Sequence, residues 1–129
     1  MPTYLLDTTV IIDALNHRQN RKLLLLDLLK QGHLLGCCPI NITEVYAGLR
    51  PKEESATEEF LQSLQYYQIT WPIARLAGLL KRDYARKGKT LTVSDATIAA
   101  VAIHHKLTLL TDNVRDFPMK ELSIYPLPA

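Results

Sequence analysis

Short apolar runs alternate with longer helical segments along this chain, and the alternation restricts the fold more than any other feature of the sequence. The pattern predicts strands at residues 4–6, 33–38, 67–70, 107–110 and 123–125. Between them it predicts helices at residues 10–15, 21–30, 41–49, 53–64, 73–87 and 95–105. Strands that alternate with helices form mostly parallel sheets covered on both faces. The sequence therefore predicts an α/β fold with a central, mostly parallel sheet flanked by helices.

Capping residues set the predicted starts of three helices. Thr8 or Thr9 can cap the first helix, and Ser94 can cap the helix at 95–105, because a hydroxyl accepts a hydrogen bond from a free backbone N–H. Asn41 and Glu44 have the spacing of a capping box, with Asn41 as the cap and Glu44 at the third helical position. Glu44 therefore has a structural explanation that is independent of any chemistry.

The size and composition of the chain are those of one folded domain. Its 129 residues, of which 47% are apolar and 22% charged, suffice for a hydrophobic core without disulfides or a structural metal. We therefore expect a single domain over residues 1–129. The formal net charge is only +2, so nucleic-acid binding would depend on a local basic patch rather than on the whole surface.

The apolar segments do not indicate a signal peptide or a membrane span. The start of the chain has no basic region before its short apolar run, and the densest apolar run, residues 23–29, is interrupted by Asp27 and too short to cross a bilayer. The two cysteines, Cys37 and Cys38, are adjacent, and adjacent cysteines rarely bridge each other, which favours a reducing intracellular compartment. We expect a soluble, cytoplasmic protein that does not bind membranes.

Acidic residues stand where a parallel sheet places its functional sites. Asp7 follows the first predicted strand, and Asp112 follows the strand at 107–110. Glu44 and Asp95 lie in the first turns of two predicted helices, which also tend to open at that edge of the sheet. Because sites in such sheets form beyond the carboxyl ends of the strands, we expect these separated acids to lie close together.

Each acid also has an ordinary explanation when it is considered alone. Asp7 can be a turn residue at the end of a strand, and Asp112 and Asp116 lie in a turn, where Asp is common. Asp95 opens a helix, where the helix dipole favours a negative charge. Considered together, three or four carboxylates repel one another unless a proton or a bound cation relieves the charge.

A carboxylate cluster without a His or Cys ligand set indicates a hard divalent cation. Mg²⁺ and Mn²⁺ prefer oxygen ligands and keep several waters, whereas zinc sites use mainly His and Cys. Two such ions can activate a water and stabilise the leaving oxygen in phosphodiester cleavage. His104 and His105 end the helix at 95–105, where the helix C-terminus favours them, and we do not expect them to bind a metal.

Four segments, in their order and spacing, resemble the PIN domain family. They are LLDTTVIID (5–13), ITEVYAGL (42–49), SDATIAAVA (94–102) and LTDNVRDF (110–117), and the resemblance covers residues 4–125. Within the family, the chain is most similar to the VapC-type toxins of bacterial and archaeal toxin–antitoxin pairs. The resemblance implies a PIN-like three-layer fold.

The resemblance also implies the site residues. Asp7, Glu44 and Asp95 are expected to hold the metal and to be catalytic. The fourth acid is Asp116 or Asp112; we favour Asp116, because some relatives have Asn at the position of Asn113 and an acid just before the following Phe.

Supporting residues follow from the same resemblance. Thr8 and Thr111 match polar positions that support the acids or contact a phosphate, and Asn113 is a further oxygen donor. Arg115 can contact a phosphate, or it can pair with a neighbouring acid of its turn. Asp13 falls outside the expected cluster and is interpreted as solvated or structural.

A VapC-like activity would be that of an Mg²⁺- or Mn²⁺-dependent endoribonuclease toxin. The expected reaction is hydrolysis of an RNA phosphodiester that leaves a 3′-hydroxyl and a 5′-phosphate, with transfer RNA or another structured RNA as the substrate. The expected partners are a cognate antitoxin that blocks the cleft and a second copy of the chain in a homodimer. Two alternatives remain: a PIN-type nuclease that processes RNA or DNA outside a toxin–antitoxin pair, and a non-catalytic PIN binding module.

Two surface features are open to two interpretations each. The segment 75–89 carries six basic residues against Asp83 alone, and these either form a solvated helix face or hold an RNA backbone. Leucines cover nearly every face of the helix at 21–30, which is more than one buried stripe requires, so part of this helix is expected to face a partner. We expect Tyr66, Tyr67 and Trp71 in the core rather than as stacking platforms for bases.

Overall fold

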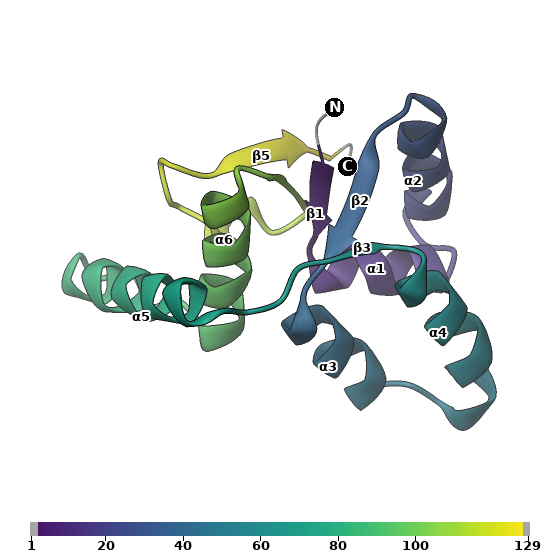
Figure 1. Ribbon diagram of the computed structural model, residues 1–129, viewed down its shortest axis with the longest axis horizontal. Helices are drawn as coiled ribbons and strands as arrows, with labels where there is room; N and C mark the ends of the chain where they lie inside the picture. Colours follow the sequence, from purple (N-terminus) through teal and green to yellow (C-terminus); the bar gives the residue numbers. More distant parts are fainter. Residues whose placement is uncertain (1–2, 128–129) are drawn as a thin grey trace.

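A five-stranded parallel sheet forms the centre of the molecule (Figure 1). The computed structural model describes residues 3–127. The strand order is β3-β2-β1-β4-β5, and every neighbouring pair is parallel, which confirms the predicted sheet. The strands are β1 (Thr3–Leu6), β2 (Leu34–Cys37), β3 (Gln65–Tyr66), β4 (Thr108–Thr111) and β5 (Ser123–Pro126).

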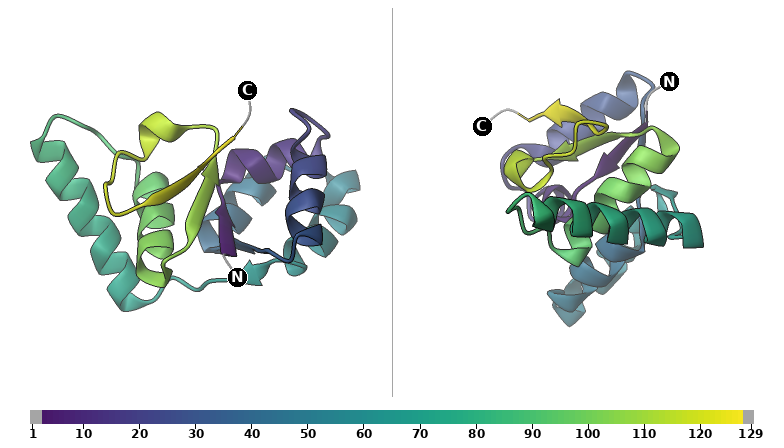
Figure 2. Two further views of the ribbon diagram at one scale, coloured as in Figure 1. Left: turned by 90° about the horizontal axis from the view of Figure 1, so that it is seen from above. Right: turned by 90° about the vertical axis from the view of Figure 1, so that its left-hand side faces the viewer.

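Helices cover both faces of this sheet, as the two further views in Figure 2 show. On one face, Leu5 and Leu109 of the central strands pack in a core with α5 and α6. On the other face, Leu6 and Leu110 pack in a second core with α1, α2, α3 and α4. Because strands buried on both faces need apolar residues at consecutive positions, the short apolar runs are explained, and the predicted three-layer α/β fold is confirmed. The helices are α1 (Thr8–Leu15), α2 (Arg21–Lys30), α3 (Pro39–Ala47), α4 (Glu54–Gln62), α5 (Trp71–Arg86) and α6 (Val93–His105), with 3-10 turns η1 (Pro51–Glu53) and η2 (Val114–Asp116).

Helix α6 is enclosed between the sheet and α5. Every residue from Ala96 to Ala102 is buried, and four of these seven are alanines. Small side chains allow the helix to approach its neighbours closely on all sides. This packing fixes the N-terminus of α6, which carries Asp95, against the carboxyl edge of the sheet.

The starts of three helices differ from the prediction. The cap of α1 is Asp7, not Thr8 or Thr9, and the cap of α6 is Thr92, not Ser94. Helix α3 begins earlier than predicted, at Pro39, so that Asn41 is its third residue rather than its cap. A proline is favoured in the first helical turn, where its missing N–H has no helical partner.

The third strand is also displaced from its predicted place at residues 67–70. The paired residues are Gln65 and Tyr66. The backbone N–H of Tyr67 still donates to the carbonyl of Cys37 at 2.9 Å, and its ring lies against Gly36 of β2. A Cβ atom at Gly36 would lie 2.7 Å from Cε2 of Tyr67, so this close approach requires glycine. After the bond to Cys37 the chain leaves the sheet, and the alternating burial at 67–70 reflects the packing of Tyr67 and Ile69 on the core.

Two aromatic residues expected in the core are exposed. Tyr66, on the edge strand β3, is 55% exposed, and Trp71, the first residue of α5, is 76% exposed. Tyr67 does pack against the core. Within residues 3–127, no helix combines the length and the apolar character that a membrane crossing requires.

Candidate active site

Asp7 lies at the centre of the carboxyl edge of the sheet, between the end of β1 and the start of α1. Its side chain is only 5% exposed. One carboxylate oxygen accepts a hydrogen bond from the backbone N–H of Thr8 at 2.8 Å, and the other accepts one from the hydroxyl of Thr111 at 2.7 Å. The carboxylate is therefore held in one orientation by groups from the start of α1 and the end of β4.

Burial raises the pKa of Asp7 above its ordinary value. The hydrogen bonds from Thr111 and Thr8 act in the opposite direction, and the charge of Glu44 raises the pKa further. The carboxylate is thus placed where its negative charge is unfavourable unless a positive charge is supplied.

Glu44 reaches the same place from α3. Its carboxylate accepts a hydrogen bond of 2.6 Å from the hydroxyl of Thr8, and the side-chain amide of Asn41 donates to that hydroxyl at 3.0 Å. Because Asn41, not Glu44, is the third residue of α3, its amide oxygen takes the capping bond, at 2.8 Å from the backbone N–H of Cys38. Glu44 is therefore free of the capping role that the sequence suggested.

Asn41 is a site residue that sequence reasoning missed. It is fully buried, and it bridges the start of α3 to the Thr8 hydroxyl. A signal was present, because Asn41 and Glu44 are three residues apart and so share one face of a helix that begins at Pro39.

Asp95 enters the site from the first turn of α6 and is half-buried. Burial is the main cause that raises the pKa of Asp95, and a hydrogen bond with Thr92 opposes it. The charges of Asp7, Asp116 and Glu44 raise this pKa as well. These acids, which come from separate parts of the chain, therefore lie within electrostatic reach of one another.

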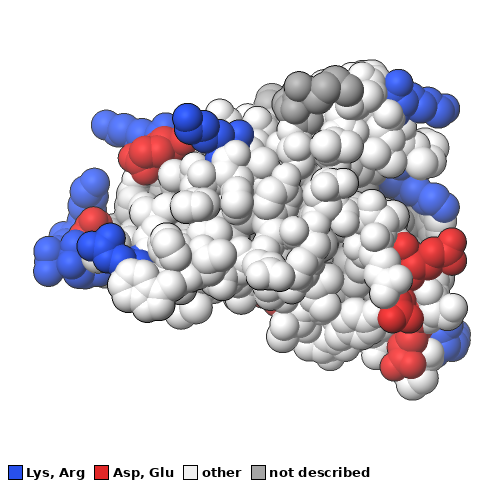
Figure 3. Space-filling model, viewed as in Figure 1, with Lys and Arg blue, Asp and Glu red and all other residues white. Residues whose placement is uncertain are grey.

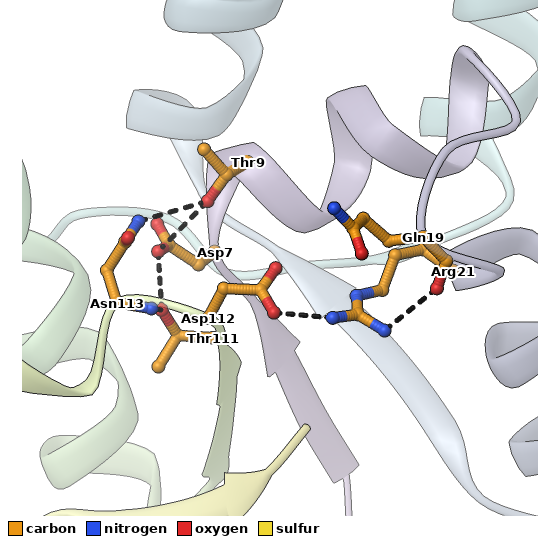
Figure 4. Close-up of polar contacts among 7 residues, drawn as sticks. All are labelled: Asp7, Thr9, Gln19, Arg21, Thr111, Asp112 and Asn113. Atoms are coloured by element: carbon orange, nitrogen blue, oxygen red, sulfur yellow. Dashed lines mark hydrogen bonds and ion pairs between the residues drawn. The ribbon is translucent and has the colours of Figure 1, made fainter. Parts of the chain in front are cut away.

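The two candidates for the fourth acid point to different partners. The charge of Asp116, on η2, acts on Asp95. The carboxylate of Asp112 forms an ion pair of 2.5 Å with Arg21, and Figure 4 shows it directed away from Asp7 toward that guanidinium. Asp116 thus lies within electrostatic reach of Asp95, whereas Asp112 is engaged by Arg21.

The remaining residues singled out from the sequence lie around this cluster. Asn113 donates from its backbone N–H to the hydroxyl of Thr111 at 2.9 Å and from its side chain to Thr9 at 3.3 Å (Figure 4). Among the ion pairs of residues 3–127, none joins Arg115 to a neighbouring acid. Asp13 lines a polar hollow together with Arg21 and Asp112.

The donor set fits a hard divalent cation. As the side chains stand, no three His, Cys, Asp or Glu residues of the described chain could hold one ion together. Mg²⁺ requires less, because it is usually bound through one or two carboxylates together with waters and substrate phosphate oxygens. The raised pKa values of Asp7 and Asp95 show that a counter-charge would be favourable here. The four acids Asp7, Glu44, Asp95 and Asp116 are the groups that could supply the ligands.

Basic residues gather at one end of the molecule. Figure 3 shows Lys and Arg clustered over the C-terminal end of α5. Some of these cations have local partners: Lys81 donates to the carbonyl of Leu91, and Arg82 pairs with Asp83 at 2.9 Å.

An apolar hollow of about 310 Å³ lies on the opposite side, between α1, α2 and α4. Leu26 and Leu29 of α2 line it and are 44% and 48% exposed, whereas Leu25 and Leu28 of the same helix are buried in the core. The leucines of α2 thus divide between the core and an open apolar surface, as the sequence predicted.

Residues 4–120 match the PIN domain family. Ribonuclease VapC19 of Mycobacterium tuberculosis is 36% identical over 115 residues, which cover 89% of this chain and 92% of that protein. Ribonuclease VapC2 of Rickettsia felis is 25% identical over 119 residues, covering 88% of this chain and 89% of that protein.

Solved structures show the same fold. The VapBC2 structure from Rickettsia felis, bound to a DNA fragment from its promoter, contains a chain that superposes with a TM-score of 0.83 at 24% identity, over 95% of this chain and 97% of that one. A toxin–antitoxin complex from Klebsiella pneumoniae contains a chain with a TM-score of 0.79 at 26% identity, over 97% of this chain and 98% of that one.

Proposed function

The chain belongs to the PIN domain family, in its VapC ribonuclease branch, and on this premise we propose that it is an endoribonuclease toxin that a cognate antitoxin inhibits. One observation carries the proposal: carboxylates from four separate segments converge at the carboxyl edge of the sheet, where burial and mutual repulsion raise the pKa of Asp7 and Asp95. The relatives named as VapC ribonucleases support the reaction class. The proposed PIN domain spans residues 1–129.

Asp7, Glu44, Asp95 and Asp116 are the proposed ligands of Mg²⁺ or Mn²⁺. When bound, such an ion would lower the pKa of a water and offset the charge of the scissile phosphate. The protein's own contribution is orientation. Thr111 and the backbone of Thr8 hold the carboxylate of Asp7, and the hydroxyl of Thr8 holds that of Glu44.

The proposed substrate is RNA, with transfer RNA or another structured RNA as the target class. Hydrolysis of the phosphodiester by water would leave a 3′-hydroxyl and a 5′-phosphate. An acidic site repels the RNA backbone, so affinity must come from elsewhere on the surface. The exposed cations at the end of α5 are the proposed source.

The proposed antitoxin contact is the apolar hollow between α1, α2 and α4. Exposed leucines there supply apolar area that water covers in the isolated chain. Solved neighbours are toxin–antitoxin complexes, which supports a protein partner of this kind. A homodimer of this chain remains part of the proposal.

The test of the reaction is cleavage of transfer RNA by the purified protein in Mg²⁺ or Mn²⁺, with the ends of the products identified. Wild type should generate 5′-phosphate ends, Glu44→Gln should be inactive, and Asp27→Asn, which alters an exposed acid of α2, should match wild type. Products with 2′,3′-cyclic phosphate ends, or equal activity of Glu44→Gln, would contradict the proposal. No cleavage by wild type on any RNA would favour a binding module instead.

A further inference from the structure

Arg21, the first residue of α2, is a buried cation next to the acid cluster. Its side chain is only 2% exposed, and its guanidinium contacts the carboxylate of Asp112 at 2.5 Å and the backbone carbonyl of Gln19 at 3.0 Å. A charge removed from water is costly unless it is paired and hydrogen-bonded, so these contacts help to fix its position. The pair joins residues that are 91 positions apart in the chain.

Asp112 begins the segment that carries the fourth acid. The residue before it, Thr111, donates to Asp7, and the residue after it, Asn113, donates from its backbone to the hydroxyl of Thr111. The backbone N–H of Asp116 in turn bonds to the carbonyl of Asn113 at 2.9 Å. The position of Asp112 is thus coupled through adjacent bonds to Asp7 (Figure 4), and the bond between Asn113 and Asp116 extends this coupling to Asp116.

The loop before α2 supplies the second contact of the Arg21 guanidinium, through the carbonyl of Gln19. His17, Gln19 and Asn20 have φ values of 57°, 55° and 57°, a left-handed conformation that residues other than glycine seldom adopt. This backbone path brings the carbonyl of Gln19 to the guanidinium of Arg21. The same guanidinium therefore binds this loop and the segment from β4 together.

We propose that Arg21 is a positioning residue for the acid cluster, which draws the carboxylate of Asp112 away from Asp7 and fixes residues 112–116 so that Asp116 faces Asp95. The inference rests on the proposed function and assigns Asp112 to ion pairing rather than to the metal. Without Arg21, Asp112 would become an additional unpaired carboxylate beside a cluster that already repels itself. The planar guanidinium fork matters here, because it can contact the carboxylate and the carbonyl at once.

The test is a double-mutant cycle of Arg21→Met and Asp112→Asn, with Mn²⁺ binding measured by calorimetry and kcat and KM measured on RNA. Loss of a group that orients ligands costs about 10- to 100-fold in metal affinity or activity. We expect Arg21→Met to show a loss of this size in Mn²⁺ affinity and in kcat, and a smaller change in KM. Asp112→Asn also breaks the pair and leaves the buried Arg21 without its counter-charge, so it should lower both quantities measurably, though by less than Asp95→Asn does. In the Arg21→Met background it should add little further loss, because the pair is already broken.

Three results would overturn the proposal. The first is Mn²⁺ affinity of Arg21→Met equal to that of wild type, and the second is independent effects of the two substitutions. The third is a defect in Asp112→Asn as large as that in Asp95→Asn, which would make Asp112 a ligand. If Arg21→Met does not fold, the comparison of Asp112→Asn with Asp95→Asn tests the proposal by itself. Arg50→Met, which removes an exposed ion pair with Glu53, is the matched control.

Wild-type behaviour separates this inference from the proposed function. A wild-type protein that neither binds Mn²⁺ nor cleaves RNA would remove the proposed function itself. If wild type both binds Mn²⁺ and cleaves RNA, but the effects of Arg21→Met and Asp112→Asn are independent, only the role of Arg21 would be contradicted.

Discussion

The hydroxyl of Thr8 lies 2.6 Å from a carboxylate oxygen of Glu44, and this contact joins the first turn of α1 to the middle of α3. The backbone N–H of the same Thr8 donates to Asp7 at 2.8 Å. One residue therefore orients two of the proposed metal ligands, through its backbone for one and its side chain for the other. Because each carboxylate comes from a different element, their mutual orientation depends on contacts of this kind.

Thr8→Val removes the hydroxyl and keeps the shape of the side chain. We expect RNA cleavage to fall by about 10- to 100-fold, the usual cost of losing a residue that orients a ligand. The backbone bond to Asp7 remains, so the protein should still bind Mn²⁺, with reduced affinity. Steady-state kinetics and calorimetry measure both effects. Thr43→Val, on the exposed side of α3, should match wild type, and equal activity of Thr8→Val would contradict the orienting role.

Asn41→Ala should lower both stability and activity. The fully buried amide accepts from the backbone of Cys38 and donates to Thr8, so its removal leaves two buried polar groups with fewer partners. An unsatisfied buried group costs about 1–3 kcal/mol, and we expect a loss of this order in the free energy of unfolding. Urea denaturation measures it. Unchanged stability together with unchanged kcat would show that water replaces the amide without consequence.

The raised pKa values of Asp7 and Asp95 predict how stability depends on pH. When the folded pKa lies above the unfolded one, the folded state holds the proton more tightly, so the metal-free protein loses stability as the pH rises from the ordinary Asp value through the raised pKa. Asp95→Asn removes this charge and should unfold at a higher temperature than wild type at neutral pH. The difference should vanish at acidic pH, where the carboxyl is protonated. Thermal unfolding across pH checks this, and a lower unfolding temperature for Asp95→Asn at neutral pH would contradict it.

In the presence of Mn²⁺, wild type should unfold at a higher temperature than Asp95→Asn. A ligand that binds only the folded state stabilises it by about 2.7 kcal/mol at one hundred times its dissociation constant. We expect added Mn²⁺ to raise the unfolding temperature of wild type and to leave that of Asp95→Asn nearly unchanged. An equal rise in both proteins would place the ion at another site.

The cations of α5 should act on RNA affinity rather than on catalysis. We expect Arg86→Ala to raise KM, to leave kcat unchanged, and to reduce the salt dependence of binding by about one phosphate contact. Lys30→Ala, on α2, is the matched control. If the salt dependence of binding is unchanged in Arg86→Ala, this residue does not contact RNA and only forms part of a solvated helix face.

Much of the fold followed from the sequence because the strongest signals are local. The apolar runs at β1, β2 and β4 reflect burial on both faces of a parallel sheet, and the alternation of strands and helices determines the class. The placement of Asp7 and Asp95 at the carboxyl edge followed from the same reasoning. Their role as metal ligands stays a prediction.

The details that sequence reasoning missed depend on contacts between distant residues or on competing local signals. Pro39 shifts the start of α3, and with it the roles of Asn41 and Glu44. The burial of Arg21 depends on a partner 91 positions away, which no local pattern indicates. The ring of Tyr67 packs where a side chain at Gly36 would collide with it, and its backbone N–H bonds to the carbonyl of Cys37.

The rate of RNA cleavage by Asp95→Asn in saturating Mn²⁺, compared with the rates of wild type and Asp27→Asn, tests the acid cluster most directly. Loss of an outer-shell partner already costs about 10- to 100-fold, so loss of a ligand should slow Asp95→Asn by at least about a hundredfold. Asp27→Asn, on the exposed surface of α2, should cleave at the wild-type rate. Equal rates in all three proteins would contradict the assignment of the cluster as the active site.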